Sequence, residues 1–444
     1  MTAVSMQVMD KERLGTLVSP RAQAFYTRGV VAMRELLHGE LTCNYDEVLT
    51  GIFMLEIYEI LSAIGLESVH SAVHQNAGMR IMKRASTLNI DTRPTAPIAV
   101  ALQSRYIYAC LSAGLPTPLC TRLDDFVAFP GVGGKLDSFA AEVADLLYER
   151  RIILNRSPQA SSPNTTSFLT PSATPKTPAS STASTDLAPS TAAVLLLRTI
   201  SLLTRLQSWY ASLPPSWHRH RLPPTSNIHS TIRISSIYAG LCDVYTSLPI
   251  SHSLGMYRVL RIASLQTRHL LETHLSHNQN SSTTPDTYAD ADVLAGANSQ
   301  PEVQALVDDL CAAVPFHLGN RGHPLEALVG TLYPPTPDWL RRKARFVDQY
   351  GAATEMTDLH HAAEAASRGG FMILMPLLGV LQLFVGGDVE GQLGQEDAEA
   401  ETGAGGGRRR RVRGNPFKLR DGQLMWMQAQ VMRTSQLLLK PSVA

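Results

Sequence analysis

The stretch DEVLTGIFMLEIYEILSAI, residues 46–64, decides the fold class of this chain. Apolar side chains occupy nearly every side of the helix that it predicts, and a helix that is apolar all round is buried on all sides. Glu56 and Glu59 interrupt this apolar surface. Because a buried acid must be paired, the stretch predicts a core helix with two polar contacts inside a larger helical assembly.

Helical periodicity recurs along most of the chain. Tyr26, Val30, Met33 and Leu37 follow one another at spacings of four, three and four residues, which is typical of one helix face. No alternating run of Val, Ile and Thr is bounded by Asn-Gly or Asp-Gly turns, so strands are not expected. The sequence therefore predicts an all-α fold, a multi-helix bundle or irregular α-solenoid with long disordered loops. The further predicted helices are residues 67–85, 98–113, 137–154, 193–212, 230–247, 255–276, 301–314, 355–384 and 421–439.

Segments of low complexity divide the helical pattern. Residues 155–192 are rich in Ser, Thr and Pro, a composition that buries too little apolar surface to offset the entropy of ordering. Its Ser-Pro and Thr-Pro pairs are either phosphorylation sites or part of an unregulated spacer. The expected organisation is an N-terminal tail at 1–20, a helical part at 21–154, a disordered linker at 155–192, and a second helical part at 193–444 with flexible loops at 277–300 and 386–415.

The charge balance and the cysteines limit the function classes. Lys and Arg number 39 against 38 Asp and Glu, so the chain lacks the basic excess that non-specific nucleic-acid binding uses. Its cysteines form no C-x-x-C pair, which excludes a zinc ribbon or redox dithiol built from neighbouring residues. Dispersed thiols of this kind suit a reducing compartment. The cysteines are Cys43, Cys110, Cys120, Cys242 and Cys311.

One uncharged stretch has nearly the length of a membrane span. Residues 369–387, GGFMILMPLLGVLQLFVGG, contain no charged side chain. Pro376, Gly379 and Gln382 interrupt it, and its continuous apolar part is shorter than the roughly 20 residues that a bilayer requires. It therefore predicts a buried core helix, and no membrane contact is expected. Residues 1–17 have no apolar region after a basic start, so a secretory signal is not expected either.

Two motifs resemble ligand sites but lack residues that the chemistry needs. His70 and His74 have the spacing of metal ligands on one helix face, but no Glu or Cys beside them completes a zinc site. Residues 131–135, GVGGK, lack the glycine spacing and the hydroxyl residue of a phosphate loop. We interpret the first as packing and the second as a turn before a helix.

Two Asp-Asp pairs are the remaining candidates for chemistry. Neither Asp124-Asp125 nor Asp308-Asp309 is followed by a third acid at the spacing that a magnesium site on facing helices needs. The sequence contains no G-x-S-x-G elbow for a nucleophilic serine. We therefore predict no catalytic, cofactor-binding or metal site, and a protein that is not an enzyme.

A short basic block lies near the C-terminus, after an acidic segment and a glycine run. Exposed runs of arginine serve as nuclear import signals, or they remain solvated loops balanced by acidic neighbours. We keep the block as a nuclear-import candidate, which predicts a nuclear location. Its residues are Arg408, Arg409, Arg410, Arg411 and Arg413.

Several phrases, taken in order, resemble the fungal-specific transcription factor domain, the regulatory middle region of zinc binuclear-cluster activators. The first is MLEIYE at residues 54–59, followed by His74 and Gly78 on the next helix. The second is LQSW at 206–209 with LPPSW at 213–217. The resemblance extends from about Tyr26 to Leu439, nearly the whole chain.

The second half of the chain carries the other phrases, and VDDLCAAVPFHLG at 307–319 is the most specific. It lies between YRVLRI at 257–262 and the phrases GGF and MPL within 369–377. These residues are also explained by packing, since tryptophans are large anchors, Pro315 is expected to end a helix and Gly319 to form a tight turn. The motif residues are Tyr58, Glu59, His74, Trp209, Trp217, Arg258, Pro315, Phe316, Gly319, Pro376 and Trp426.

The resemblance implies a nuclear regulator of gene expression, including secondary-metabolite genes, without a cofactor. Family members read DNA through a six-cysteine zinc cluster, which this sequence lacks. The expected partners are therefore proteins, either a second copy or a complete zinc-cluster factor, with DNA contacted indirectly or through an N-terminal cluster missing from this sequence. Two alternatives stay open: a non-DNA-binding accessory of a complete factor, and a helical enzyme for an apolar substrate.

Overall fold

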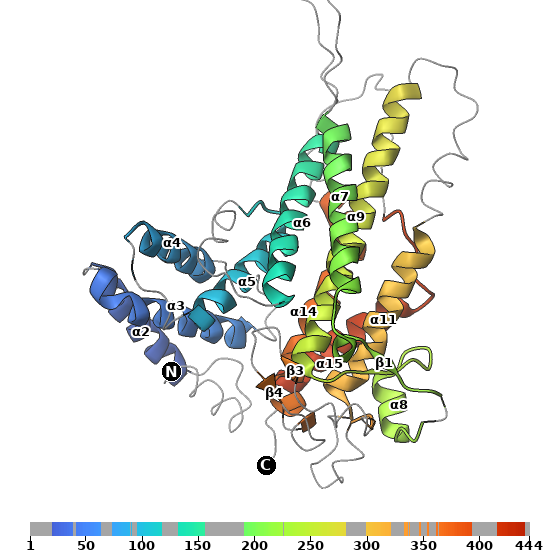
Figure 1. The fold of residues 1–444 in the computed structure, drawn as a ribbon. Helices are drawn as coiled ribbons and strands as arrows, with labels where there is room; N and C mark the ends of the chain where they lie inside the picture. The colour runs from blue at the N-terminus through green and yellow to red at the C-terminus, as the bar shows by residue number, and fades with distance from the viewer. Residues whose placement is uncertain are drawn as a thin grey trace, which may run out of the picture.

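Helices form nearly all of the regular structure in the described part of the chain, which confirms the all-α expectation (Figure 1). The computed structural model describes residues 20–38, 41–63, 73–88, 90, 96–117, 132–155, 191–224, 226–280, 299–320, 333–335, 337, 346–347, 353–354, 361–362, 364–392 and 415–439. The α-helices of this part are α2 (Pro20–His38), α3 (Leu41–Ala63), α4 (Val73–Thr87), α5 (Ala96–Ala113), α6 (Val132–Asn155), α7 (Thr191–Ala211), α8 (Ser230–Ser236), α9 (Leu248–Asn280), α11 (Gln300–Leu318), α14 (Gly370–Gln392) and α15 (Gln423–Leu439).

In the described residues, four short strands accompany the helices. β1 (His220–Arg221) pairs antiparallel with β2 (Asp243–Val244), and β3 (Phe346–Val347) pairs antiparallel with β4 (Ala353–Thr354). The described residues also include two short helical turns. They are the 3₁₀ turn η2 (Pro215–Trp217) before β1 and the π-helical turn η4 (Ala365–Gly369) before α14.

The long helix α9 is the centre of the assembly. It packs against α6, α7, α11 and α14, and α6, α7 and α9 run side by side (Figure 1). α2, α3 and α4 pack on one another to one side and reach the other helices through α5, which packs on α6. α14 packs on both α9 and α15. The two halves of the sequence therefore meet mainly where α6 packs on α7 and α9.

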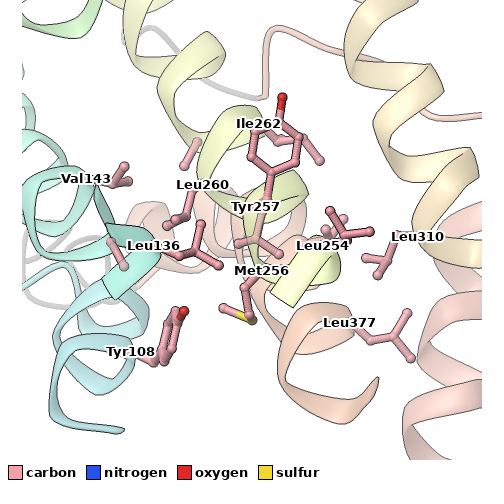
Figure 2. Packing of buried hydrophobic residues seen from close by; sticks show 14 of the residues in the cluster. Tyr108, Leu136, Val143, Leu254, Met256, Tyr257, Leu260, Ile262, Leu310 and Leu377 are labelled. Carbon is pink, nitrogen blue, oxygen red and sulfur yellow. The ribbon is translucent and has the colours of Figure 1, made fainter. Parts of the chain in front are cut away.

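The core is formed where these elements converge on α9. Tyr108 of α5 and Leu136 and Val143 of α6 lie opposite the buried side chains of α9 (Figure 2). α14 approaches α9 closely because glycine is present on both helices. A Cβ atom on Gly255 would lie 2.9 Å from Pro376 Cγ, and one on Gly379 would lie 2.9 Å from Val259 Cγ1.

The uncharged stretch at 369–387 lies in this core, as predicted. Ile373, Leu377, Val380 and Leu381 of α14 are buried within the hydrophobic cluster. Among the described helices, none combines the length and the apolarity that crossing a membrane requires.

The prediction of one helix over residues 230–247 is wrong. α8 ends at Ser236, and Ile237 is extended with φ −95° and ψ 126°. Ala239 and Gly240 follow with φ values of 51° and 73°, a left-handed turn that leads to β2. Residues 242–247 are buried without being helical. The spacing of apolar residues in a short run does not distinguish a strand from a helix.

The prediction that Pro315 ends its helix is also wrong. α11 continues to Leu318, and Pro315 lies inside it. Burial of every residue from 310 to 318 holds the last turn in place despite the amide proton that proline lacks. Gly319, with φ 48°, ends the helix and donates its backbone N–H to the Pro315 carbonyl at 2.9 Å, so the turn predicted at Gly319 is present.

Several helix bounds differ from the predicted ones. α9 begins at Leu248 and continues to Asn280, and α14 continues to Gln392, so the first residues of the expected loops 277–300 and 386–415 are helical. The expected helix at 355–384 contains the π-helical turn η4 before α14 begins. The predictions that lie outside the described residues concern the tail at 1–19, His70, Asp124, Asp125, residues 156–190, and the arginines Arg408, Arg409, Arg410, Arg411 and Arg413.

Candidate functional site

Three motif residues, Tyr58, Glu59 and His74, belong to one polar cluster that joins α2, α3 and α4. The Tyr26 hydroxyl donates to Glu59 Oε1 at 2.8 Å, and His74 Nε2 lies 3.0 Å from the same oxygen. The Tyr26 and Tyr58 rings stack with centroids 4.5 Å apart, and the Tyr58 hydroxyl donates to Gln23 Oε1 at 2.9 Å. Burial, assisted by Glu59, raises the pKa of Tyr26, so its phenol stays protonated as a donor. These contacts therefore hold α2, α3 and α4 together.

The acid Glu56 is fully buried and paired, as the sequence predicts. Gln75 Nε2 donates to Glu56 Oε1 at 2.8 Å, and Arg105 Nη1 lies 3.4 Å from the same atom. The Arg105 guanidinium carbon also lies 5.9 Å from the centre of the Phe53 ring and 5.4 Å from that of Phe371. Arg105 therefore connects the acid of α3 to α14, across the junction of the two halves.

A network of arginines and aspartates holds β1 against β2 and α11. Arg221 donates to Asp243 from Nε at 2.7 Å and from Nη2 at 3.0 Å, and both Arg219 and Arg221 also pair with Asp309. The hydrogen bond to Asp243 raises the pKa of Arg221. Asp309, considered for a magnesium site in the sequence, is thus part of an ion-pair network.

The neighbouring Asp308 faces a different set of groups. Arg420 Nη2 donates to Asp308 Oδ2 at 2.6 Å, and Gln423 Nε2 donates to Asp308 Oδ1 at 3.0 Å. Gln304 Nε2, one turn away on α11, donates to the same Oδ1 at 2.8 Å. These contacts fasten the start of α15 to α11. Among the described residues, no group of three or more His, Cys, Asp or Glu side chains has the arrangement of a metal site.

The aromatic motif residues lie at contacts between helices. Trp209 and Trp217 are buried, and the Trp209 ring centre lies 5.5 Å from that of Tyr257 on α9. Trp426 of α15 lies 5.2 Å from Tyr238, measured between ring centres. Arg258, also a motif residue, is buried and donates from Nη2 to the Tyr245 hydroxyl at 3.2 Å. These residues build the core.

Phe316 and His317, near the end of the stretch VDDLCAAVPFHLG at 307–319, belong to a buried cluster. The Phe316 ring stacks on His361 at 4.2 Å and lies 5.6 Å from Tyr245, between ring centres. His317 Nδ1 lies 3.3 Å from the Gly369 carbonyl oxygen, and Nε2 lies 2.9 Å from Ser251 Oγ. In the neutral tautomer, Nδ1 donates to the carbonyl and Nε2 accepts from the serine, so both ring nitrogens are bonded.

Stability should fall as the pH falls below 6.5, because of His317. Burial, then His252 and His361, lower the pKa of His317 from 6.5 to about 3. The folded protein keeps this imidazole neutral while the unfolded chain takes up a proton, so stability is full above pH 6.5 and is lost between pH 6.5 and 3. At pH 5 the expected loss is about 2 kcal/mol. Urea unfolding at several pH values measures it, and His317→Gln should remove this part of the slope. An unchanged slope in the variant contradicts the assignment.

The buried cysteines are inert side chains of the core. Cys110, Cys242 and Cys311 are free thiols without access to solvent. Burial raises the pKa of Cys242 and of Cys311 to about 12. A thiol that stays protonated at neutral pH is a weak nucleophile, so these residues act as small apolar groups.

A cavity of about 370 Å³ lies at the junction of the two halves. Its inner wall is formed by buried side chains, among them Tyr108 of α5, Leu147 of α6 and Met256 of α9. Tyr108 and Met256 point toward the same space between their helices (Figure 2). Ser112, Ala113, Arg151, Asn155 and Gln382 line its outer part and are exposed.

The described lining of this cavity is mostly apolar, with a few polar and charged side chains. Arg150 and Arg151, at the end of α6, supply its charged side chains, and Gln266, Gln382 and Asn415 supply amides. Among the described residues that line it, none carries a carboxylate, imidazole or thiol, and Tyr108 and Ser112 supply hydroxyl groups. A small molecule held here would contact mainly apolar side chains. The cavity could not be predicted from the sequence, because its walls come from four helices that are distant in sequence.

Comparisons with known proteins add no relative. Neither a protein-family model, nor a curated protein, nor a solved structure matches this chain.

Proposed function

We propose that this chain is a regulator of gene transcription that acts through its helical domain, as its resemblance to the fungal-specific transcription factor domain implies. The observation that supports the proposal is the location of the motif residues. Tyr58, Glu59 and His74 join the first three described helices, and Phe316 and Trp426 lie where α11 and α15 contact their neighbours. Residues that are distant in sequence thus serve one purpose, the packing of a regulatory scaffold.

The mechanism proposed is a change in the exposed helical surface, controlled by a ligand or a protein partner. A ligand shifts such a scaffold only if it binds one arrangement of the helices more tightly than another. The cavity at the junction of the halves offers a place for such a ligand, which would contact mainly apolar side chains. A protein partner, a second copy or a complete zinc-cluster factor, is proposed to supply or share the DNA contact in the nucleus.

A tethering experiment tests this function. The full chain is fused to an unrelated DNA-binding domain and directed to a reporter gene in a fungal cell. We expect expression to change several-fold relative to the DNA-binding domain alone, because the helical surface recruits or blocks the transcription machinery. A fusion of Phe316→Leu, which keeps the core apolar, should behave as the unchanged chain does. Reporter expression equal to that of the DNA-binding domain alone contradicts the proposal.

The balanced charge of the chain favours one variation of this function, a non-DNA-binding accessory that pairs with a complete factor and titrates it. Purified chain is mixed with promoter fragments at low salt, with and without a zinc-cluster factor. The accessory role predicts no sequence-specific retention by this chain alone and reduced binding by the factor when the chain is added. Sequence-specific retention by the chain alone refutes it.

A further inference from the structure

We propose that the outer face of α7 is a surface through which two copies of this chain associate, with their α7 helices side by side and antiparallel. The association itself does not depend on the proposed function. Only its use in transcription, where a second copy is one of the expected partners, rests on that function. The outer face is defined by the exposed residues Val194, Leu197, Ser201, Thr204, Ser208 and Ala211.

The two sides of α7 have different surroundings. The helix lies beside α6 and α9 and packs on both (Figure 1). Leu195 and Leu202 are buried on this inner side. On the outer side, by contrast, Leu197 is 67% exposed, and Val194 and the adjoining Ile200 are 42% and 39% exposed. Exposed apolar side chains that adjoin one another mark an interaction surface, whereas exposed apolar residues scattered singly are normal.

The spacing of the outer face suits a second helix. From Val194 to Ala211 its members follow one another at three, four, three, four and three residues. This is the spacing of the a and d positions of a heptad, which keep one side of a helix toward a partner helix. None of the six members is charged, although the solvated face of a helix usually carries charged residues.

The hydroxyl groups of the outer face do not oppose its burial. Thr204 Oγ1 donates to the Ile200 carbonyl oxygen at 3.0 Å, and Ser208 Oγ donates to the Thr204 carbonyl oxygen at 2.9 Å. Burying a hydroxyl is costly chiefly when it has no hydrogen bond, and these two already have one within α7. A partner helix can therefore remove both side chains from water at little cost.

The distribution of side-chain size along the outer face favours a second copy as its occupant. The large residues Val194 and Leu197 lie in the first half of α7, and Ser208 and Ala211 lie in the second half. A twofold axis near the middle of α7 places Val194 opposite Ala211 of the second copy, and Leu197 opposite Ser208. Every large side chain then meets a small one, as close packing requires. A parallel pair would crowd one end and leave a gap at the other.

The charges beside the outer face do not keep two copies apart. Arg198 and Arg205 flank it, and they pair with Glu149 and Glu142 of α6. The Arg205 guanidinium carbon also lies 5.6 Å from the centre of the Phe139 ring. Because these two ion pairs carry no net charge, they add no net repulsion between two identical surfaces.

The length of α7 sets the expected strength of the association. Its 21 residues correspond to about 31 Å. One helix pair of this length buries less than the roughly 1,200–2,000 Å² of a standard protein interface. We therefore expect a reversible dimer with a dissociation constant in the micromolar range.

Sedimentation equilibrium of the purified full chain at increasing concentration tests the proposal. We expect a reversible equilibrium between monomer and dimer. Leu197→Arg should weaken the association about tenfold or more, because it places like charges in a surface that must leave water. Ile234→Arg is the matched control, since Ile234 is 86% exposed on α8 and should leave the equilibrium unchanged. Both positions are exposed, so the urea midpoints of the two variants should equal that of the wild type.

An exchange of the two opposed residues tests the antiparallel arrangement. Ser208→Leu should weaken the association about fivefold, because two leucines then compete for one space. Adding Leu197→Ser to the same chain restores a leucine opposite a serine, and the association should return to within about threefold of the wild type.

Three results would overturn the proposal. The first is a wild-type chain that stays monomeric at every concentration, as expected if another part of the chain or a different protein occupies the outer face. The second is equal association of Leu197→Arg and Ile234→Arg, and the third is an exchange that restores nothing. The reporter experiment is independent of these measurements, since a dimer without any reporter response keeps the surface and contradicts only its role in transcription.

Discussion

Replacing Arg105 by Met should destabilise the protein by about 3–5 kcal/mol, the usual cost of breaking a buried ion pair from one side. Glu56 is fully buried, and its Oε1 atom contacts Arg105 Nη1 and Gln75 Nε2. Among the described residues, Glu56 Oε2 has no hydrogen-bond partner. Methionine keeps the length and the apolar stem of the side chain but removes the cation, so the carboxylate stays buried with one donor.

The same substitution removes a contact between the halves of the chain. Arg105 of α5 lies over the rings of Phe53 of α3 and Phe371 of α14. A partly desolvated cation over an aromatic ring is worth about 0.5–2 kcal/mol. We therefore expect the variant to weaken the packing of α5 on α14 as well as the pairing with Glu56.

A double-mutant cycle separates these effects. Equilibrium urea unfolding is measured for Arg105→Met, for Glu56→Gln and for the two together, and the double variant should recover part of the loss because no unpaired carboxylate remains. Arg198→Met is the control, since Arg198 and Glu149 form an exposed pair expected to contribute less than about 1 kcal/mol. A loss at Arg105 as small as that at Arg198 contradicts the role assigned to the buried pair.

Much of the helical content could be predicted because it depends on local pattern. The helix predicted at 193–212 is observed as Thr191–Ala211, and its buried residues Leu195, Leu202, Leu206 and Trp209 follow the period of one helix face. The paired state of Glu56 was also predictable, since burying an unpaired charge is too costly to be common.

The failures occur where distant contacts outweigh local preference. Residues 237–247 are not helical because Asp243 pairs with Arg219 and Arg221, which lie 24 and 22 positions away in the chain. Pro315 stays helical because the surrounding core fixes α11. No local pattern contains either constraint.

The candidate site was less predictable than the fold. Arg150 and Arg151 precede the end of α6 and resemble solvated charges in the sequence, and Gly379 resembles only a break in an apolar run. Their common cavity exists because α9 and α14 approach closely while α5 and α6 close the other side. Two adjacent arginines in the last two turns of a helix were the available signal, and they carry little information without the neighbouring helices.

Replacing Phe316 by Ala should be the second severe change, with an expected loss of about 3–5 kcal/mol in the free energy of unfolding. Phe316 is among the largest fully buried side chains. Its ring contacts His361 and Tyr245, so truncation leaves a cavity lined by aromatic groups that are fixed by their own partners. Tyr245 receives the hydrogen bond of the buried Arg258, which limits how far it can move to fill the space.

The matched variant Phe316→Leu separates the effect of lost side-chain volume from the effect of lost aromatic contacts. Leucine fills most of the space, so its expected cost is below that of alanine by about 2 kcal/mol or more, and it measures the aromatic contacts alone. Met425→Ala on the exposed face of α15 should change stability by no more than about 0.5 kcal/mol. If alanine and leucine at position 316 cost the same, the aromatic stacking on His361 and Tyr245 carries the stabilisation, and the cavity argument fails. If neither substitution lowers the free energy of unfolding, the packing of α11 does not depend on the Phe316 ring. The stretch VDDLCAAVPFHLG would then stabilise the protein through the ion pairs of its aspartates.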